Sequence, residues 1–212
     1  MIVTRGLREG DPLPSTKELA DSFGASLVVI REALAGLASH GVLRRRQGRQ
    51  STVAKPSFES LSSVLRLRAH LEGIDLDEFL VCREALEVEA SALAAASPDP
   101  ERKARALQPH LDGMRAAKAG PRATFNEHDL GFHLEIARLS GNRAIGFILM
   151  SLNDVVRAGL LARYDHLQRR AGNPGIGLSL EHHEAIAAAI IAGDVEGSIA
   201  AMRSHFAFVA TT

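Results

Sequence analysis

Apolar residues recur at helical spacing in two short segments near the beginning of the chain. Ser15, followed three residues later by Glu18, has the spacing of a capping box that opens a helix, and Gly24 ends that helix. Ser26 can cap a second helix. Its apolar residues recur along one side: Ile30, Ala33, Leu34 and Leu37. Residues 42–53 then suit two short strands around an exposed polar turn, so the pattern predicts a winged helix-turn-helix.

After residue 57 the pattern is helical almost throughout. Alanine and leucine dominate, strand-like alternation is absent, and breaks rich in Gly and Pro divide the remainder into about six helices. The breaks fall at 97–100, 120–121, 140–142, 173–175 and 193–194. Consecutive helices joined in this way pack as a bundle. The predicted fold class is therefore mainly α, with an N-terminal winged helix-turn-helix and a C-terminal all-helical bundle.

The composition is that of a globular protein. The 212 residues are 46% hydrophobic and 24% charged, which suits one large or two modest domains. The single cysteine, Cys82, cannot form an internal disulfide, so a disulfide-stapled secreted module is excluded. No apolar stretch approaches the roughly 20 residues of a membrane span, and no signal-peptide core follows Met1. These features predict a cytoplasmic protein with no membrane partner.

Charge is divided unevenly along the chain. Residues 1–56 hold nine Lys and Arg against five Asp and Glu, a net charge of +4, and residues 57–212 hold a net charge of −4. Four basic residues lie in or beside the expected turn of the hairpin: Arg44, Arg45, Arg46 and Arg49. Alone, such a run is usually a solvated face. Next to a helix-turn-helix it favours contact with the DNA backbone.

The same segment carries a sequence motif. Its residues are Leu13-Pro14-Ser15, Glu18-Leu19-Ala20, Ile30-Arg31-Glu32-Ala33-Leu34, Leu37 and Gly41-Val42-Leu43. Over most of residues 10–53 they closely resemble the signature of the GntR superfamily of bacterial regulators. The positions that this resemblance implies for DNA contact are Lys17, Ser26, Arg31 and, in the wing, Gly48 beside Arg49. Lysine and arginine supply phosphate contacts and guanine recognition, and a glycine lets the wing backbone approach the duplex.

Three departures from the family pattern bear on DNA binding. Leu27 stands where the family usually has Arg, and Gln50 replaces the second glycine of the wing. We also expect most of the family's first helix to be missing, because the chain begins only a few residues before Gly10. The departures predict weakened binding or altered specificity. One hypothesis is therefore a helical dimer whose N-terminal part does not bind DNA.

A candidate metal site lies in the helical part of the chain. One apolar stripe is formed by Phe125, Phe132, Ile136 and Leu139, and Asp129 falls within it. A buried carboxylate needs a cation or strong donors, and His133 lies one turn later on the same side. His183 lies ten residues before Gly193, and His205 lies eleven residues after Asp194. If the chain folds back at Gly193-Asp194, both imidazoles approach Asp129 and His133, and the set suits Zn or another first-row divalent ion.

Periodicity leaves a choice between two adjacent histidines. His182 and His183 are about 100° apart on a helix, and both border the apolar face of Ile186 and Ile190. The other histidines, His110 and His128 among them, are expected at the surface.

The C-terminal part of the chain also resembles a known domain. The matching residues are Asp129 to His133, Ser140-Gly141-Asn142, Glu181 to Ile190, Gly193-Asp194, Met202 and His205. They look like the FCD effector domain of the FadR subfamily, from about Leu76 to Phe208. The resemblance implies a metal held by Asp129, His133, His183 and His205, and a small carboxylate bound there. It selects His183 over His182 by the separation of 22 residues from His205.

The expected domains follow from these two resemblances. Residues 1–55 form a winged helix-turn-helix with a truncated first helix, 56–75 a linker and connecting helix, and 76–212 an FCD-like domain.

Arg83 is a candidate for binding the effector. It lies on the stripe between Leu80 and Leu86, and an inward guanidinium needs an anionic partner because it stays charged. An ion pair with Glu87 or Asp129 is one interpretation. The family resemblance implies another, an effector carboxylate, and further candidates for lining that cavity are Asn153 and Arg157.

The leading hypothesis is a homodimeric, metabolite-responsive regulator that binds two-fold symmetric operator DNA and a small organic acid. Zn is the metal expected first, with Ni, Mn or Fe as alternatives. The other hypothesis is a metal-dependent enzyme acting on small carboxylic acids. It lacks a clear general base, since Glu135 and Glu184 adjoin metal candidates in sequence but point in other directions on a helix. No catalytic residue is assigned.

Overall fold

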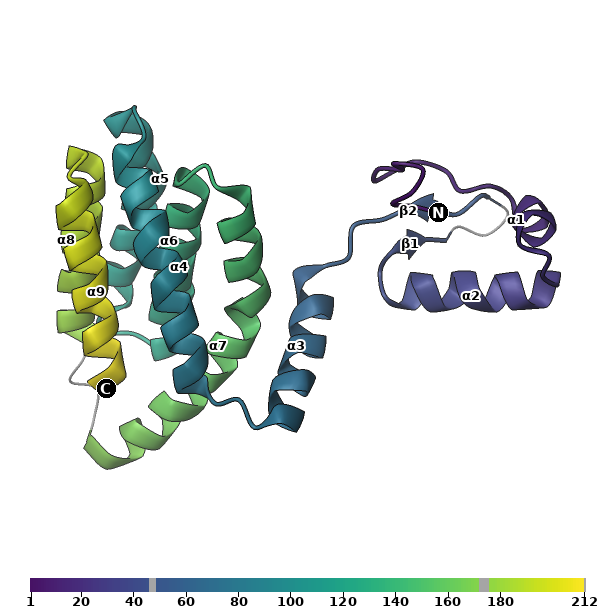
Figure 1. Ribbon diagram of the computed structural model, residues 1–212. Helices are drawn as coiled ribbons and strands as arrows, with labels where there is room; N and C mark the ends of the chain where they lie inside the picture. Colours follow the sequence, from purple (N-terminus) through teal and green to yellow (C-terminus); the bar gives the residue numbers. More distant parts are fainter. Residues whose placement is uncertain (46–48, 172–175, 212) are drawn as a thin grey trace. The chain divides into compact units, whose positions relative to one another are not determined.

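The computed structural model of the protein describes residues 1–45, 49–171 and 176–211. Within these ranges it contains nine helices and one two-stranded sheet, so the prediction of a mainly α fold is confirmed (Figure 1). The contacts divide the chain into two compact units, residues 1–64 and 65–212. Helix α3, Phe58–Glu72, crosses this division.

The first unit contains two capped helices. Helix α1, Thr16–Phe23, begins at Ser15 with the predicted capping box to Glu18 and ends at a left-handed glycine. Helix α2, Leu27–Ser39, is capped by Ser26. The Ser26 hydroxyl accepts a hydrogen bond of 3.3 Å from the backbone amide of Val29, the third residue of the helix. Local side-chain chemistry thus sets where both helices begin.

A short hairpin follows the two helices. Strand β1, Leu43–Arg44, pairs antiparallel with β2, Thr52–Val53. The apolar core that joins helices and hairpin consists of Leu13, Leu19, Ala20, Ile30, Leu34, Leu43 and Val53. The predicted order of helix, turn, helix and hairpin is confirmed. The tip of the wing at 46–48, which includes Gly48, lies outside the described residues.

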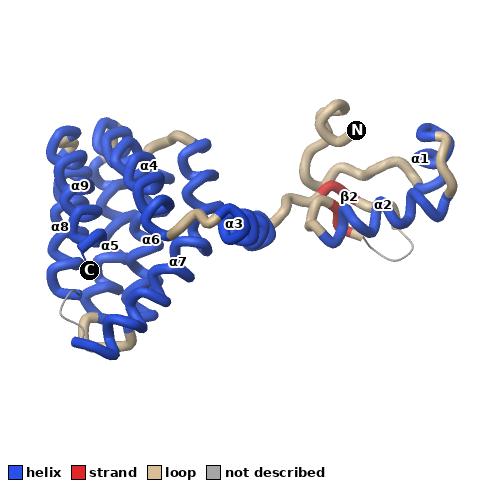
Figure 2. The backbone as a smooth tube through the Cα atoms, turned by 60° about the horizontal axis from the view of Figure 1, so that its bottom comes forward, coloured by secondary structure: helices blue, strands red, loops and turns tan. Residues whose placement is uncertain are grey.

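The second unit is a helical bundle. Its helices after α3 are α4 Leu76–Ala96, α5 Pro100–Ala117, α6 Arg122–Leu139, α7 Arg143–Ala171, α8 Ile176–Ala192 and α9 Val195–Thr211. Helix α4 packs on α9, α5 on α6, and α8 on α9, and Figure 2 shows these helices alongside one another. In the described parts of the chain no single helix is long and apolar enough to cross a membrane. Only α1 and α2 taken together, across a bend of 111°, reach that apolar length.

The predicted apolar stripe of α6 is the centre of this bundle. Phe125, Phe132 and Ile136 are 0–1% exposed and belong to one buried apolar cluster with residues of α4, α5, α8 and α9. Gly73, with φ of 71°, and the N-cap Asp75 separate α3 from α4, close to the division expected between residues 75 and 76. The described residues after 57 form seven helices, whereas the Gly- and Pro-rich breaks alone indicated about six.

Helices α5 and α6 approach closely through two histidine–glycine contacts. The ring of His110 lies over Gly131, and the ring of His128 lies over Gly113. A Cβ atom on Gly131 would lie 2.5 Å from Cε1 of His110, and one on Gly113 would lie 2.3 Å from Cε1 of His128. The expectation that both histidines lie at the surface is therefore wrong. They are half-buried because a glycine on the facing helix leaves room for each ring.

We expect Gly131→Ala to destabilise the protein by about 1–3 kcal/mol, because the new methyl group overlaps the His110 ring. Gly146→Ala on α7 is the matched control, since a Cβ atom there meets nothing within 4 Å. Removing a helical glycine should leave the control unchanged or stabilise it by up to about 1 kcal/mol. Urea unfolding followed by circular dichroism measures both. Equal stability of the two variants would contradict the close approach.

Candidate metal centre

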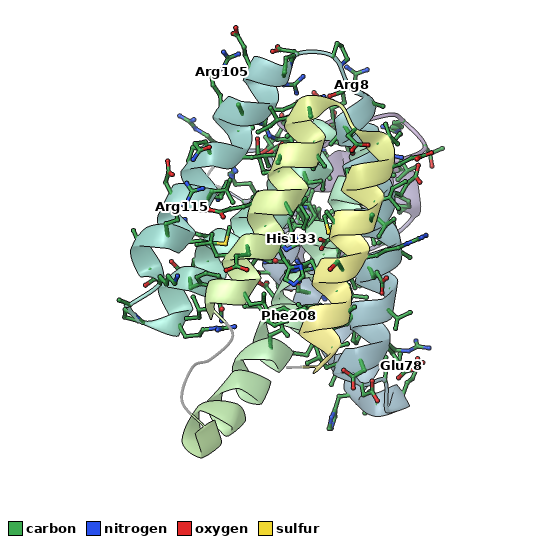
Figure 3. All side chains as sticks on the ribbon, turned by 90° about the vertical axis from the view of Figure 1, so that its left-hand side faces the viewer. Arg8, Glu78, Arg105, Arg115, His133 and Phe208 are labelled. Atoms are coloured by element: carbon green, nitrogen blue, oxygen red, sulfur yellow. The ribbon has the colours of Figure 1, made fainter. Side chains whose placement is uncertain are left out.

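Four side chains proposed from the sequence come together inside the helical unit. Asp129 and His133 lie on α6, His183 on α8 and His205 on α9, and one ligand atom from each lies within 4.8 Å of the others. The three histidines are 0–3% exposed, whereas the Asp129 side chain is 22% exposed. Figure 3 shows His133 in the interior of the bundle. The cluster is therefore buried, with its carboxylate edge open to solvent.

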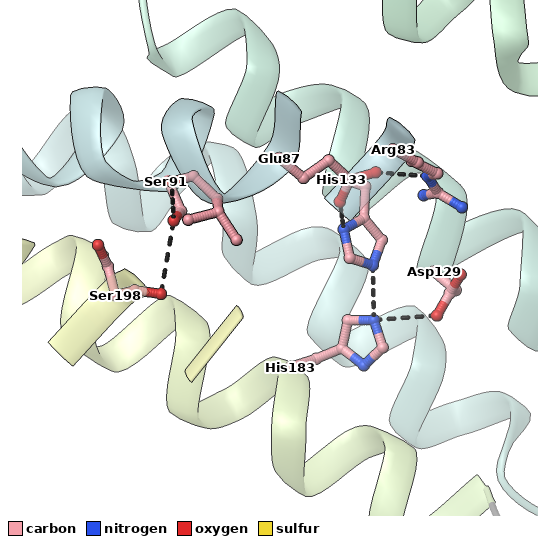
Figure 4. A network of polar contacts seen from close by, with 8 residues as sticks. Arg83, Glu87, Ser91, Asp129, His133, His183 and Ser198 are labelled. Carbon is pink, nitrogen blue, oxygen red and sulfur yellow. Dashed lines mark hydrogen bonds and ion pairs between the residues drawn. The ribbon is translucent and has the colours of Figure 1, made fainter. Parts of the chain in front are cut away.

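The hydrogen bonds of His183 determine which of its atoms faces the cluster. Its Nδ1 lies 2.6 Å from the carbonyl oxygen of Ser179, which only accepts, so Nδ1 carries the proton. In the neutral ring, Nε2 then has a lone pair. This atom lies 2.9 Å from Asp129 Oδ1 and 3.3 Å from His133 Nε2 (Figure 4).

A buried carboxylate orients His133 in the same way. The Nδ1 atom of His133 contacts Oε2 of Glu87. Glu87 also accepts a hydrogen bond from Nε of Arg83 (Figure 4). A proton on Nδ1 serves this contact and leaves the lone pair on Nε2. Three electron-rich atoms therefore converge: Oδ1 of Asp129 and the two Nε2 atoms. Such an arrangement needs a positive charge at its centre, which a proton or a metal ion can provide.

The charge states of the cluster suit metal coordination. Burial and the neighbouring His183 and His133 hold the pKa of His205 well below its ordinary value, so this ring is neutral near pH 7. Burial alone would raise the pKa of Asp129, but when His183 is protonated its hydrogen bond and charge outweigh burial and hold this pKa below its ordinary range. An ionised carboxylate and a neutral imidazole are the forms that bind metals.

His205 is the fourth candidate metal ligand of the cluster. Its Nδ1 is buried and has no hydrogen-bond partner among the described residues. The centroid of its ring lies 4.6 Å from that of His183 and 5.0 Å from that of His133. A buried polar atom without a partner is costly, and a bound cation would satisfy it.

Glu87 is a residue of the site that the sequence analysis considered only as a partner of Arg83. It is 1% exposed, and burial alone would raise its pKa, but Arg83 and His133 lower that pKa, so it remains a carboxylate. The spacing of four residues from Arg83 is a sequence signal for their ion pair, which the structure contains. Nothing in the sequence links Glu87 to His133, because the two lie on different helices.

His182 points away from the cluster. Its Nδ1 lies 3.5 Å from Oγ of Ser204, and its ring stacks on Phe208 with centroids 5.2 Å apart. The structure therefore brings His183, and not its neighbour, to Asp129.

A small pocket adjoins the cluster at Asp129. Its empty space, the open mouth included, is about 380 Å³. The lining residues are Arg83, Arg122, Asn126, Asp129, Leu130, Val156, Arg157 and Leu160. Two of the three candidate effector residues, Arg83 and Arg157, are therefore in the lining. The third, Asn153, lies one turn before Arg157, and its buried Oδ1 has no hydrogen-bond partner in the described part of the chain.

The candidate DNA-contacting residues lie on the surface of the first unit. Lys17 is exposed in the first turn of α1, Arg31 is exposed on α2, and Arg49 is exposed beside the wing tip. Ser26 caps α2. Leu27, the departure from the family motif, is 43% exposed at the first position of α2.

Comparisons with known proteins agree with this architecture. The model of the FCD domain matches residues 78–208, and the model of bacterial regulatory proteins of the gntR family matches residues 1–53. The chain is 28% identical to the HTH-type transcriptional regulator LutR of Bacillus subtilis, over 97% of this chain and 92% of that protein. It is 29% identical to the Glc operon transcriptional activator of Escherichia coli, over 80% of this chain and 68% of that protein.

The fold is shared with the solved structure of Streptococcus agalactiae GntR, with a TM-score of 0.66 and 23% identity, covering 98% of this chain and 92% of that one.

We expect Glu87→Ala to lower the free energy of unfolding by about 3–5 kcal/mol, because it leaves the Arg83 guanidinium buried without its partner. Glu89→Ala is the control, since Glu89 lies on the same helix and is exposed. Its effect should be far smaller. Chemical denaturation of the metal-free protein measures both variants, and similar midpoints would mean that the buried ion pair contributes little.

Proposed function

The chain belongs to the GntR family of bacterial regulators and carries an FCD domain, and on this premise we propose that its helical domain holds a divalent metal ion and senses a small carboxylate. The observation that supports the metal is the convergence of lone pairs at Asp129, His133 and His183. Two of these ligand atoms belong to rings already held on their far sides, His183 by a hydrogen bond with Ser179 and His133 by an ion-pair contact with Glu87. Ligating histidines in metal sites are commonly held in this way.

The donor set fits a first-row divalent ion. At metal–ligand distances of about 2.0–2.1 Å, adjacent ligand atoms lie about 2.9–3.4 Å apart. The two measured separations at Nε2 of His183 are 2.9 Å and 3.3 Å. Asp129, His133, His183 and His205 would hold the ion, with Zn expected first and Ni, Mn or Fe as alternatives. The ion would act as a Lewis acid that accepts a carboxylate oxygen.

The proposed effector is a small organic acid in the pocket at Asp129. Arg83, Asn153 and Arg157 are the residues proposed to bind it besides the metal. Binding would shift the population between two arrangements of a homodimer. The change in the free-energy difference between these arrangements is set by how much more tightly the effector binds one of them than the other. Residues 1–55 would bind operator DNA, and residues 76–212 would bind the effector. Residues 56–75 would connect these two domains. The protein would act in the cytoplasm.

The proposed DNA-binding surface combines Lys17, Ser26, Arg31 and Arg49 with Gly48. Regulators of this family bind operator DNA, and the exposed cations suit phosphate contacts and guanine recognition. Leu27 cannot donate a hydrogen bond to a base. We therefore propose that base recognition differs here from that of relatives with arginine at this position.

An enzymatic function is not favoured. The matched families and both relatives are regulators of transcription. The two candidate general bases also have other partners. Glu135 is paired with Arg138, and Glu184 accepts hydrogen bonds of 2.7 Å and 2.9 Å from Arg115.

We expect the purified protein to contain about one divalent ion per chain, because four donors form a single cluster. Asp129→Ala and His205→Ala should each lower the metal content severalfold after reloading and desalting. His182→Ala is the matched control, as it removes the adjacent imidazole, which points away from the cluster, and it should keep the full content. Elemental analysis is the measurement. Metal far below one equivalent in the reloaded wild-type protein would rule out the site.

We expect DNA binding to weaken steeply with salt, because phosphate contacts release counterions. Arg31→Ala should reduce affinity about tenfold or more, as the loss of one base or phosphate contact does. Arg105→Ala removes the same charge from the exposed face of α5 and should have little effect. Gel-shift titration with the neighbouring intergenic DNA tests this. No shift by the wild-type protein at low salt would contradict DNA binding by this chain.

We expect small carboxylates to raise the melting temperature of the metal-loaded protein, because a ligand that binds only the folded state stabilises it. At a hundredfold excess over the dissociation constant, the stabilisation should be about 2.7 kcal/mol. Chelation of the metal should abolish the response. A thermal-shift screen of lactate, pyruvate, malate, citrate and sugar acids measures it. Stabilisation that survives chelation would contradict carboxylate binding at the metal.

A further inference from the structure

Three consecutive apolar side chains are exposed at the N-terminal end of α2. Leu27 is 43% exposed, Val28 61% and Val29 53%. The residues of the same helix that build the core of the first unit, Ile30 and Leu34, are buried. Single exposed apolar side chains are common on protein surfaces, whereas a contiguous group of them points to a contact surface. In a helix-turn-helix this end of the second helix meets the base edges of the major groove, so the group lies where sequence is recognised.

Two of the three side chains share a face of α2 with Arg31, a candidate for DNA contact. Leu27 lies four residues before Arg31 and Val28 lies three, and these spacings make side chains neighbours on a helix. Val29 lies two residues before Arg31, about 160° away around the helix axis. The first turn is fixed by Ser26, whose hydroxyl accepts a hydrogen bond of 3.3 Å from the amide of Val29. Leu27 and Val28 therefore hold defined positions beside a cation that can contact phosphate or guanine.

The chemistry of these two side chains discriminates among the bases. Leucine and valine carry no hydrogen-bonding group, so they cannot recognise the acceptors of guanine or the donors of adenine and cytosine. Covering those groups would remove water from them without providing a partner, which is unfavourable. Thymine alone presents a methyl group in the major groove, and apolar side chains contact it. Glu32, one turn after Val28, is exposed and can accept a hydrogen bond from cytosine, so it does not compete for the methyl group.

The positive charge of the first unit supplies affinity that does not depend on sequence. Residues 1–56 have a net charge of +4, and Lys17 and Arg49 are exposed. Their contacts with phosphate would position the protein on the duplex without distinguishing one base from another. Discrimination therefore falls to the side chains at the start of α2.

We propose that Leu27 and Val28 contact thymine methyl groups in the major groove, so that this chain selects A·T pairs where a relative with arginine in place of Leu27 selects guanine. This inference rests on the proposed DNA binding and specifies the bases that are recognised. The thymine methyl group, and not the hydrogen-bonding pattern of the base pair, carries the discrimination at these positions.

The test removes that methyl group alone. The metal-loaded full chain selects its preferred sequence from a library of randomised duplexes, and each thymine of that sequence is then replaced singly by uracil, which preserves base pairing. At each contacted thymine we expect affinity to fall about threefold to fivefold, the effect of one buried apolar carbon. Leu27→Ala and Val28→Ala should each abolish the effect of uracil at one of these thymines. Val29→Ala is the matched control, because it shortens an equally exposed valine on the other side of the helix, and it should keep the full effect.

A converse variant changes the preferred base. Leu27→Arg should select guanine in place of the thymine that Leu27 contacts, because arginine donates to the two acceptors of guanine. All four variants change exposed positions, so their melting temperatures should stay close to that of the wild-type protein.

Each other result overturns a distinct claim. If the chain selects a sequence but uracil leaves its affinity unchanged, thymine recognition is wrong and DNA binding stands. If Leu27→Ala and Val28→Ala both keep the full effect of uracil, the assignment to these residues is wrong. If wild-type protein binds all duplexes equally, base recognition by α2 fails and phosphate contact stands. If it binds no duplex at low salt, the proposed DNA binding itself fails, and this inference fails with it.

Discussion

The helical unit is organised around a requirement for positive charge in its core. Nε2 of His183 lies 2.9 Å from a carboxylate oxygen and 3.3 Å from another imidazole nitrogen. The far sides of both rings are committed to Ser179 and Glu87, so neither ring can turn its N–H inward without giving up a buried contact. Four helices are involved, because α4 supplies Glu87, α6 Asp129 and His133, α8 His183, and α9 His205. A cation at the cluster therefore links most of the bundle.

Helix geometry brings these groups together from distant parts of the sequence. On α6, spacings of seven, four and three residues bury the apolar stripe and carry Asp129 and His133 inward with it. Between α8 and α9 the chain reverses at Gly193, whose φ of 76° is one that residues with a side chain rarely adopt. The two histidines at nearly equal distance from this turn consequently meet beside α6. The apolar stripe and the candidate metal ligands thus share the same helical faces.

The sequence alone predicted the features that depend on local side-chain chemistry or on two residues lying at similar distances from a turn. Ser15, Ser26 and the glycines at helix ends predicted boundaries, and the distances of His183 and His205 from Gly193 predicted that they meet. Features that depend on contacts between helices were not predictable. Glu87 reaches His133 only after α4 packs against α6, and His110 becomes half-buried only because Gly131 on another helix makes room.

The charges of the cluster favour the proposed pairing of a metal ion with an anion in this core. Asp129 and Glu87 carry two negative charges and Arg83 one positive charge, so with neutral histidines the group has a net charge of −1. A divalent ion changes this to +1, and a carboxylate bound to that ion returns it to zero. Buried net charge is costly in a low-dielectric interior, so each step favours the next.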